Sequence, residues 1–170
     1  MTDHSDNLLR AVVKSLRDVV APAVDTADPM AQQQLALSLN ALEFVRSRLG
    51  DLHAREVFEL EHHVNMGRRV QAELGAETER LDGALTVGEK VLADPRARDL
   101  SLRRATAAIA SAIRDLVASP LDDAIRRRVD LAILESTEAR VAFERAWYQP
   151  MGFDPDAATI GSVQAAMSAN

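Results

Sequence analysis

The chain has 170 residues, of which 27% are charged and 47% hydrophobic, and it carries a net charge of −6. Its 29 Ala residues and its low aromatic content of 4% exclude an all-β fold, because Ala favours helices and aromatic side chains favour strands. The absence of Cys excludes a disulfide scaffold, a thiolate zinc site, an iron–sulfur cluster and a Cys nucleophile.

Helix starts are marked by an Asp or Ser directly before a Pro. The side chain accepts N–H groups of the first helical turn, and Pro at the first position has no N–H to lose. The pattern occurs at Asp28-Pro29, Asp94-Pro95, Ser119-Pro120 and Asp154-Pro155. Together with apolar residues at helical spacing, it predicts helices over 5–21, 29–49, 51–74, 76–93, 95–118, 120–148 and 155–167.

The loops between these helices are short, which places neighbours in the sequence antiparallel. We therefore expect an all-α fold, an up-and-down helical bundle of four to five long helices plus a short C-terminal helix. The bundle domain is expected to span 1–150, and the segment 151–170 is expected to pack back on the bundle or on a partner. The N-terminal residues lack the basic and apolar pattern of a signal peptide, and the chain has no apolar run of about 18 residues, so we expect a cytoplasmic protein that does not contact membranes.

The predicted helices 29–49 and 120–148 carry apolar residues on two opposite faces. In the second of them, Leu134, Val141 and Tyr148 recur every seven residues, opposite the inner stripe. A helix that is apolar on two sides needs two neighbours. For these three residues the second neighbour is either the C-terminal segment, folded back over them, or a second copy of the chain in a dimer.

Three of the four His residues lie in the predicted helix 51–74. On a helical wheel, His53, Glu56 and His63 lie within about 60° of the core direction, whereas His62 lies about 160° away. His53 can touch Glu56, and Glu59 can touch His63, because residues three or four apart are neighbours on a helix. These four residues form a hydrogen-bonded seam, or a bundle end where this face meets water, or a polar pocket for a cation or a small polar ligand.

A di-iron site is not expected, although Glu59-x-x-His62 has the spacing of such sites. The two side chains point to different sides of the helix, and no His follows His63 to supply the second half of the motif. Glu56 and His63 are about 10 Å apart along the helix axis and cannot share one metal ion. We therefore expect no metal and no cofactor. Gly-rich phosphate loops, His-Glu-x-x-His and Gly-x-Ser-x-Gly are all absent, and no catalytic residue is predicted.

Basic residues cluster at 68–69, 103–104 and 126–128, in segments of mixed charge. Proteins that bind nucleic acid usually carry a basic excess, which this chain lacks. We expect these clusters to form solvated, ion-paired helix faces, and we expect no nucleic-acid partner.

The segments Leu8–Val24 and Ala31–Leu49 resemble a family of small, uncharacterised bacterial helical proteins. Members of that family tend to be encoded beside an aminoglycoside-phosphotransferase-like kinase and an acyl-CoA dehydrogenase. The resemblance covers about the first 50 residues. It implies no catalytic residue and suggests an accessory role beside a kinase-like enzyme.

We therefore predict a non-catalytic, cytoplasmic bacterial protein that acts by protein–protein contact, as a homodimer or as an accessory subunit. The alternative is a small-ligand- or metal-binding bundle, or an enzyme, that uses His53, Glu56, Glu59 and His63. A closed seam with paired polar atoms favours the first function, and an open pocket with shifted pKa values favours the second.

Overall fold

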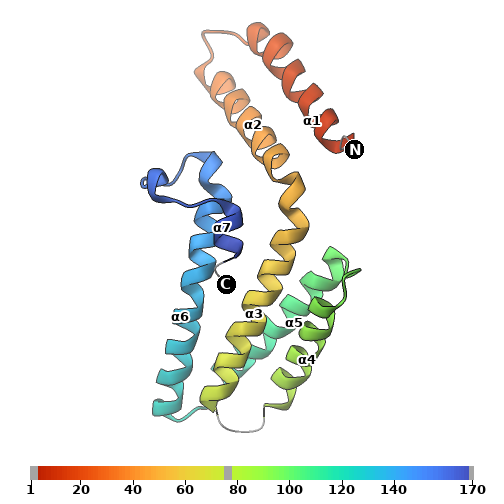
Figure 1. Ribbon diagram of the computed structural model, residues 1–170. Helices are drawn as coiled ribbons and strands as arrows, with labels where there is room; N and C mark the ends of the chain where they lie inside the picture. Colours follow the sequence, from red (N-terminus) through yellow and green to blue (C-terminus); the bar gives the residue numbers. More distant parts are fainter. Residues whose placement is uncertain (1–3, 75–77, 169–170) are drawn as a thin grey trace. The chain divides into compact units, whose positions relative to one another are not determined.

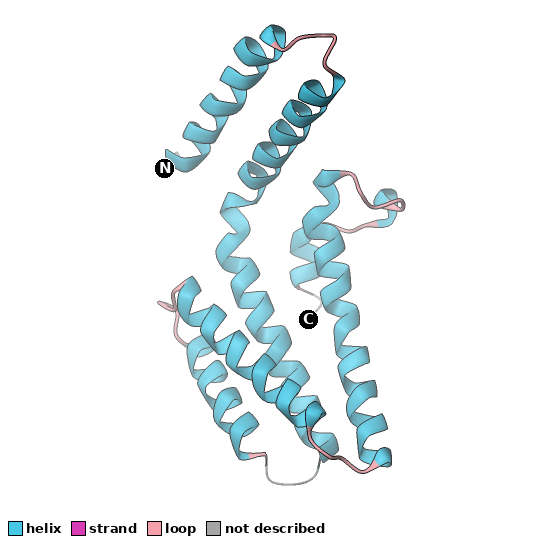
Figure 2. Cartoon of the chain, turned by 180° about the vertical axis from the view of Figure 1, so that it is seen from behind, coloured by secondary structure: helices cyan, strands magenta, loops and turns pink. Residues whose placement is uncertain are grey.

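A computed structural model describes residues 4–74 and 78–168 of the chain. These residues form helices and loops and no strand, which confirms the predicted all-α helical bundle (Figure 2). The chain divides into two compact units, whereas the sequence predicted one bundle over 1–150. The first unit runs up to Leu52 and includes Tyr148–Pro155, and the second comprises His53–Trp147 and the chain from Asp156 onward.

The first unit is built on two antiparallel helices, α1 and α2 (Figure 1). α1 is shorter than the predicted helix 5–21, because the chain continues beyond it as a π-helical turn and then a 3-10 turn. α2 begins as predicted, and its N-cap Asp28 accepts a hydrogen bond from the N–H of Ala31 at 3.0 Å. The elements are α1 (His4–Ser15), η1 (Leu16–Val20), η2 (Ala21–Ala23), α2 (Pro29–Arg48), η3 (Leu49–Asp51) and η4 (Gln149–Met151).

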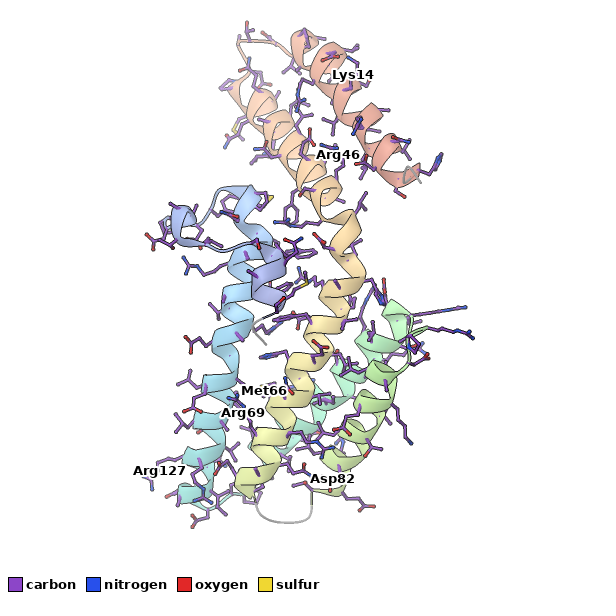
Figure 3. All side chains as sticks on the ribbon, in the orientation of Figure 1. Lys14, Arg46, Met66, Arg69, Asp82 and Arg127 are labelled. Carbon is purple, nitrogen blue, oxygen red and sulfur yellow. The ribbon has the colours of Figure 1, made fainter. Side chains whose placement is uncertain are left out.

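Polar contacts, rather than a buried core, join α1 to α2. Arg46 of α2 lies 3.3 Å from Asp6 of α1 and 2.9 Å from Glu43 of its own helix. Figure 3 shows Arg46 on α2 and Lys14 on α1. Val13 is the buried residue of this unit among the residues that the structure describes, and no residue of α2 is buried. The two apolar faces expected for α2 are therefore only partly covered: α1 packs against this helix, and its Phe44 stacks on Tyr148.

The second unit places α3 between α6 on one side and the α4–α5 pair on the other (Figures 1 and 2). Ion pairs join α3 to each of these helices, at Arg55–Glu144, Arg68–Glu89 and Arg103–Glu56. The elements are α3 (Leu52–Leu74), α4 (Glu79–Ala93), α5 (Asp99–Ala118), α6 (Asp123–Tyr148), η5 (Ala157–Thr159) and α7 (Val163–Met167). None of the described helices has the length and hydropathy to cross a membrane.

Three of the four predicted Pro starts are wrong. α5 begins at Asp99 rather than at 95, because Asp94 accepts the N–H of Arg96 at 2.9 Å and closes a turn there. α6 begins at Asp123 rather than at 120, and its first turn is capped by Asp122, which accepts the N–H of Ala124 at 2.8 Å. The predicted helix 155–167 is reduced to η5 and α7. Asp-Pro and Ser-Pro suit tight turns as well as helix starts.

The core of the second unit depends on two glycines. Leu60, Leu85 and Ile109 are fully buried where α3, α4 and α5 meet. A Cβ atom on Gly88 of α4 would lie 2.9 Å from Ile109 Cδ1, and one on Gly67 of α3 would lie 2.8 Å from Leu85 Cδ2. The lack of a side chain at these positions lets the helices approach closely.

Candidate functional site

The four site residues predicted on α3 do not meet in one site. His53 Nδ1 lies 2.7 Å from Asp99 Oδ1, and both side chains are exposed. Glu56 pairs with Arg103 of α5 at 3.0 Å. These two predicted residues therefore bind charged partners on α5.

Glu59 and His63 lie on the side of α3 that packs against α6. The Glu59 carboxylate pairs with Arg140 Nε at 3.3 Å. His63 Nδ1 lies 2.7 Å from the backbone oxygen of Glu59, so this nitrogen carries a proton and donates to the carbonyl. Both side chains are largely buried. This half of the predicted site is a paired, mostly closed cluster.

His62 also faces α6, although the helical wheel directed it away from the core. Its side chain is only 3% exposed and stacks on Phe58, with ring centroids 6.4 Å apart. It meets His63 edge to face at 5.3 Å. The helical-wheel prediction assumes a single buried face on α3, whereas α3 has helices packed on two sides. The spacing of Phe58 and His62, four residues apart, was the available signal for this second face.

Both buried His residues are neutral at physiological pH. Burial, together with the nearby His63 and Arg140, lowers the pKa of His62 to about 4, against an opposing effect of Glu59. Burial also lowers the pKa of His63, against the hydrogen bond to the Glu59 carbonyl and the Glu59 charge. Each neutral ring presents one N–H donor and one nitrogen acceptor.

A groove of about 350 Å³ opens beside His62, between α3 and α6. The His62 ring forms no hydrogen bond with another described residue. Its nitrogens are nevertheless not fully buried. The ring therefore reaches the groove. We call this feature the histidine groove; it is lined by His62, Asn65, Arg68, Arg69, Glu135, Ser136 and Ala139.

The metal-binding alternative has little geometric support. Within residues 4–74 and 78–168, no group of three or more His, Asp or Glu side chains is arranged to hold a metal ion. His53 and Glu56 are paired with α5, and Glu59 is paired with Arg140. A cation would have to displace these partners to bind.

The predicted interface residues lie on the outer face of α6. Leu134 is 68% exposed and Val141 is 51% exposed, and Leu131 on the same face is 54% exposed. Tyr148, at the end of the helix, stacks on Phe44 of α2 with ring centroids 5.4 Å apart. In the C-terminal segment Val163 is buried, but the segment does not cover Leu134 or Val141. Of the two neighbours considered for these residues, the folded-back segment is not found.

Comparisons with known proteins give no relative. No protein-family model matches the chain, and no curated protein or solved structure is significantly similar to it. The resemblance of the N-terminal segments to the bacterial helical family therefore remains a prediction.

Proposed function

We propose that this chain is a non-catalytic helical interaction protein that acts as a homodimer, with the outer face of α6 as the interface. The observation that carries the proposal is the exposure of Leu131, Leu134 and Val141 on one face of a long helix. Exposed apolar residues gathered on one face of a helix are typical of a protein-binding surface.

The outer face of α6 has the spacing of a helix-pairing seam. Its residues follow one another at intervals of three and four positions, which is the heptad spacing of paired helices. All of them are exposed. We call this set the α6 stripe; it consists of Ala124, Arg127, Leu131, Leu134, Glu138 and Val141.

The charges of the α6 stripe favour an antiparallel pair of identical helices. With the two-fold axis between Leu131 and Leu134, each of these leucines meets the other on the second copy. Arg127 then faces Glu138 of the partner subunit, and neither residue has an ion pair among the described residues. A parallel pair would instead set like charges against each other. Because the stripe is complementary to itself, the partner we propose is a second copy.

The location and cellular role follow the same proposal. We place the dimer in the bacterial cytoplasm as part of this proposal. An accessory role beside a kinase-like enzyme is the role that the N-terminal resemblance suggests.

The molar mass in solution tests the proposal. Light scattering coupled to size exclusion should give twice the chain mass of 18.5 kDa for the natural protein. Leu134→Glu sets two carboxylates at the two-fold axis and should raise the dimer dissociation constant at least about tenfold. Leu100→Glu on α5 is the matched control, because Leu100 is also exposed and lies outside the stripe. A natural protein that is monomeric at high concentration would overturn the proposal.

A further inference from the structure

Two opposite charges that line the histidine groove have no ion-pair partner among the described residues. Arg68 is occupied, because its Nε donates to Glu89 at 2.9 Å and its Nη1 donates to Gln71 at 2.9 Å. Arg69 and Glu135 form no ion pair, either with each other or with another described residue. One positive and one negative charge therefore line the same groove from different helices.

The two walls of the groove differ in what they contribute. α3 supplies His62, Asn65, Arg68 and Arg69. Figure 3 shows Arg69 on the side of α3 that faces α6. α6 supplies Glu135 and the small side chains of Ser136 and Ala139, which leave the space open. The Ser136 hydroxyl donates to the Ala132 carbonyl of its own helix at 2.7 Å, so its proton is not available to a ligand in the groove.

We propose that the histidine groove binds a small zwitterion of the amino-acid class, with its carboxylate on Arg69 and its ammonium group on Glu135. The volume of about 350 Å³ lies in the range of small-molecule sites. His62, which is buried and has no hydrogen-bond partner among the described residues, lies in the wall of the groove and provides a directional polar contact.

The charges select against simpler ligands. A ligand with only a carboxylate is attracted by Arg69 and repelled by Glu135. A ligand with only an ammonium group is attracted by Glu135 and repelled by Arg69, so in both cases the repulsion offsets the attraction. A zwitterion satisfies both, and the guanidinium of Arg69 can hold a carboxylate through two parallel hydrogen bonds. This proposal is independent of the dimer, because the α6 stripe shares no residue with the groove.

Isothermal titration calorimetry of the full chain tests the proposal. The probes are the common amino acids and ω-amino acids of increasing chain length, with acetate and ethylamine as single-charge references. We expect at least one zwitterion to bind with a dissociation constant of about 1 mM or tighter, and both references to bind at least about tenfold more weakly. Failure of every zwitterion to bind at about 10 mM would overturn the proposal, as would equal binding of a reference.

Charge-removing variants locate the binding site. Arg69→Gln and Glu135→Gln should each weaken binding of the zwitterion at least about tenfold. Arg104→Gln on α5 and Glu61→Gln on α3 are matched controls, because both residues are exposed and lie outside the groove. Unchanged affinity in either groove variant, with the mass and melting temperature also unchanged, would place the ligand elsewhere and reject the assignment.

Discussion

Leu134 and Val141 lie seven residues apart on the outer face of α6, and both side chains are more than half exposed. The opposite face of the same helix buries Val129 and Phe143. α6 is therefore fully engaged on its inner side and still presents an apolar surface on its outer side. A helix with this distribution is completed by a second neighbour. In our account that neighbour is α6 of another copy.

Gly88→Ala should destabilise the protein. A Cβ atom at this position would lie 2.9 Å from Ile109 Cδ1 and 3.1 Å from Val64 Cγ2, so the core must shift, at a cost of about 1–3 kcal/mol. Gly83→Ala on the same helix is the matched control, because a Cβ atom at this position meets nothing within 4 Å. This substitution should stabilise the helix by about 0.5–1 kcal/mol. Urea unfolding measures both changes. Equal effects of the two substitutions would show that the core accepts a methyl group at position 88 without loss of stability.

Phe143→Ala should cost about 3–5 kcal/mol of unfolding free energy, because it removes a fully buried ring. Phe143 stacks on Phe58 of α3 at 4.1 Å and lies beside Trp147 at 5.7 Å. The ring of Phe153, in contrast, is largely exposed, and Phe153→Ala should change stability by less than about 0.5 kcal/mol. Thermal melting followed by circular dichroism compares the two variants. A small effect at position 143 would mean that α3 and α6 are not held together by this stack.

Acid should destabilise the fold through His62. Its pKa is lowered to about 4 in the folded chain, and the ordinary value of about 6.5 applies to the unfolded chain. Between these pH values the unfolded chain binds more protons, so stability falls as the pH drops through this window. Below about pH 4 both states are protonated and this contribution is exhausted.

The variant His62→Gln removes this contribution and keeps a neutral polar side chain. The stability of the natural protein relative to the variant should fall by on the order of 2 kcal/mol between about pH 7 and about pH 4. Denaturant unfolding at several pH values measures the difference in unfolding free energy between the natural protein and the variant. Glu59, Arg140 and His63 are present in both proteins, so their contributions cancel in this difference. Parallel stability profiles would show that the pKa of His62 is not lowered in the folded chain.

Local spacing predicts the existence of the long helices better than their ends, since apolar periodicity acts within one segment. α2 and α3 end within a residue of their predicted limits. The failures at Pro95 and Pro120 are also local, because an Asp or Ser before Pro stabilises a turn as readily as a helix start.

The candidate site was harder to predict, because it depends on which helices lie beside α3. Glu59 and His63 were expected to be neighbours, and they are. His62 was directed away from the core on the assumption of one buried face, and α6 covers the other. The partners Asp99, Arg103 and Arg140 lie far away in the sequence, so spacing within α3 carries no information about them.

Charge reversal across the α6 stripe tests the central claim most directly. Arg127→Glu should weaken the dimer at least about tenfold, because it sets like charges against Glu138 of the partner subunit, and Glu138→Arg should do the same. The double variant with both substitutions restores opposite charges and should recover the dimer mass measured by light scattering. If the double variant is as monomeric as the single ones, or if none of the three changes the mass, the antiparallel α6 dimer is contradicted.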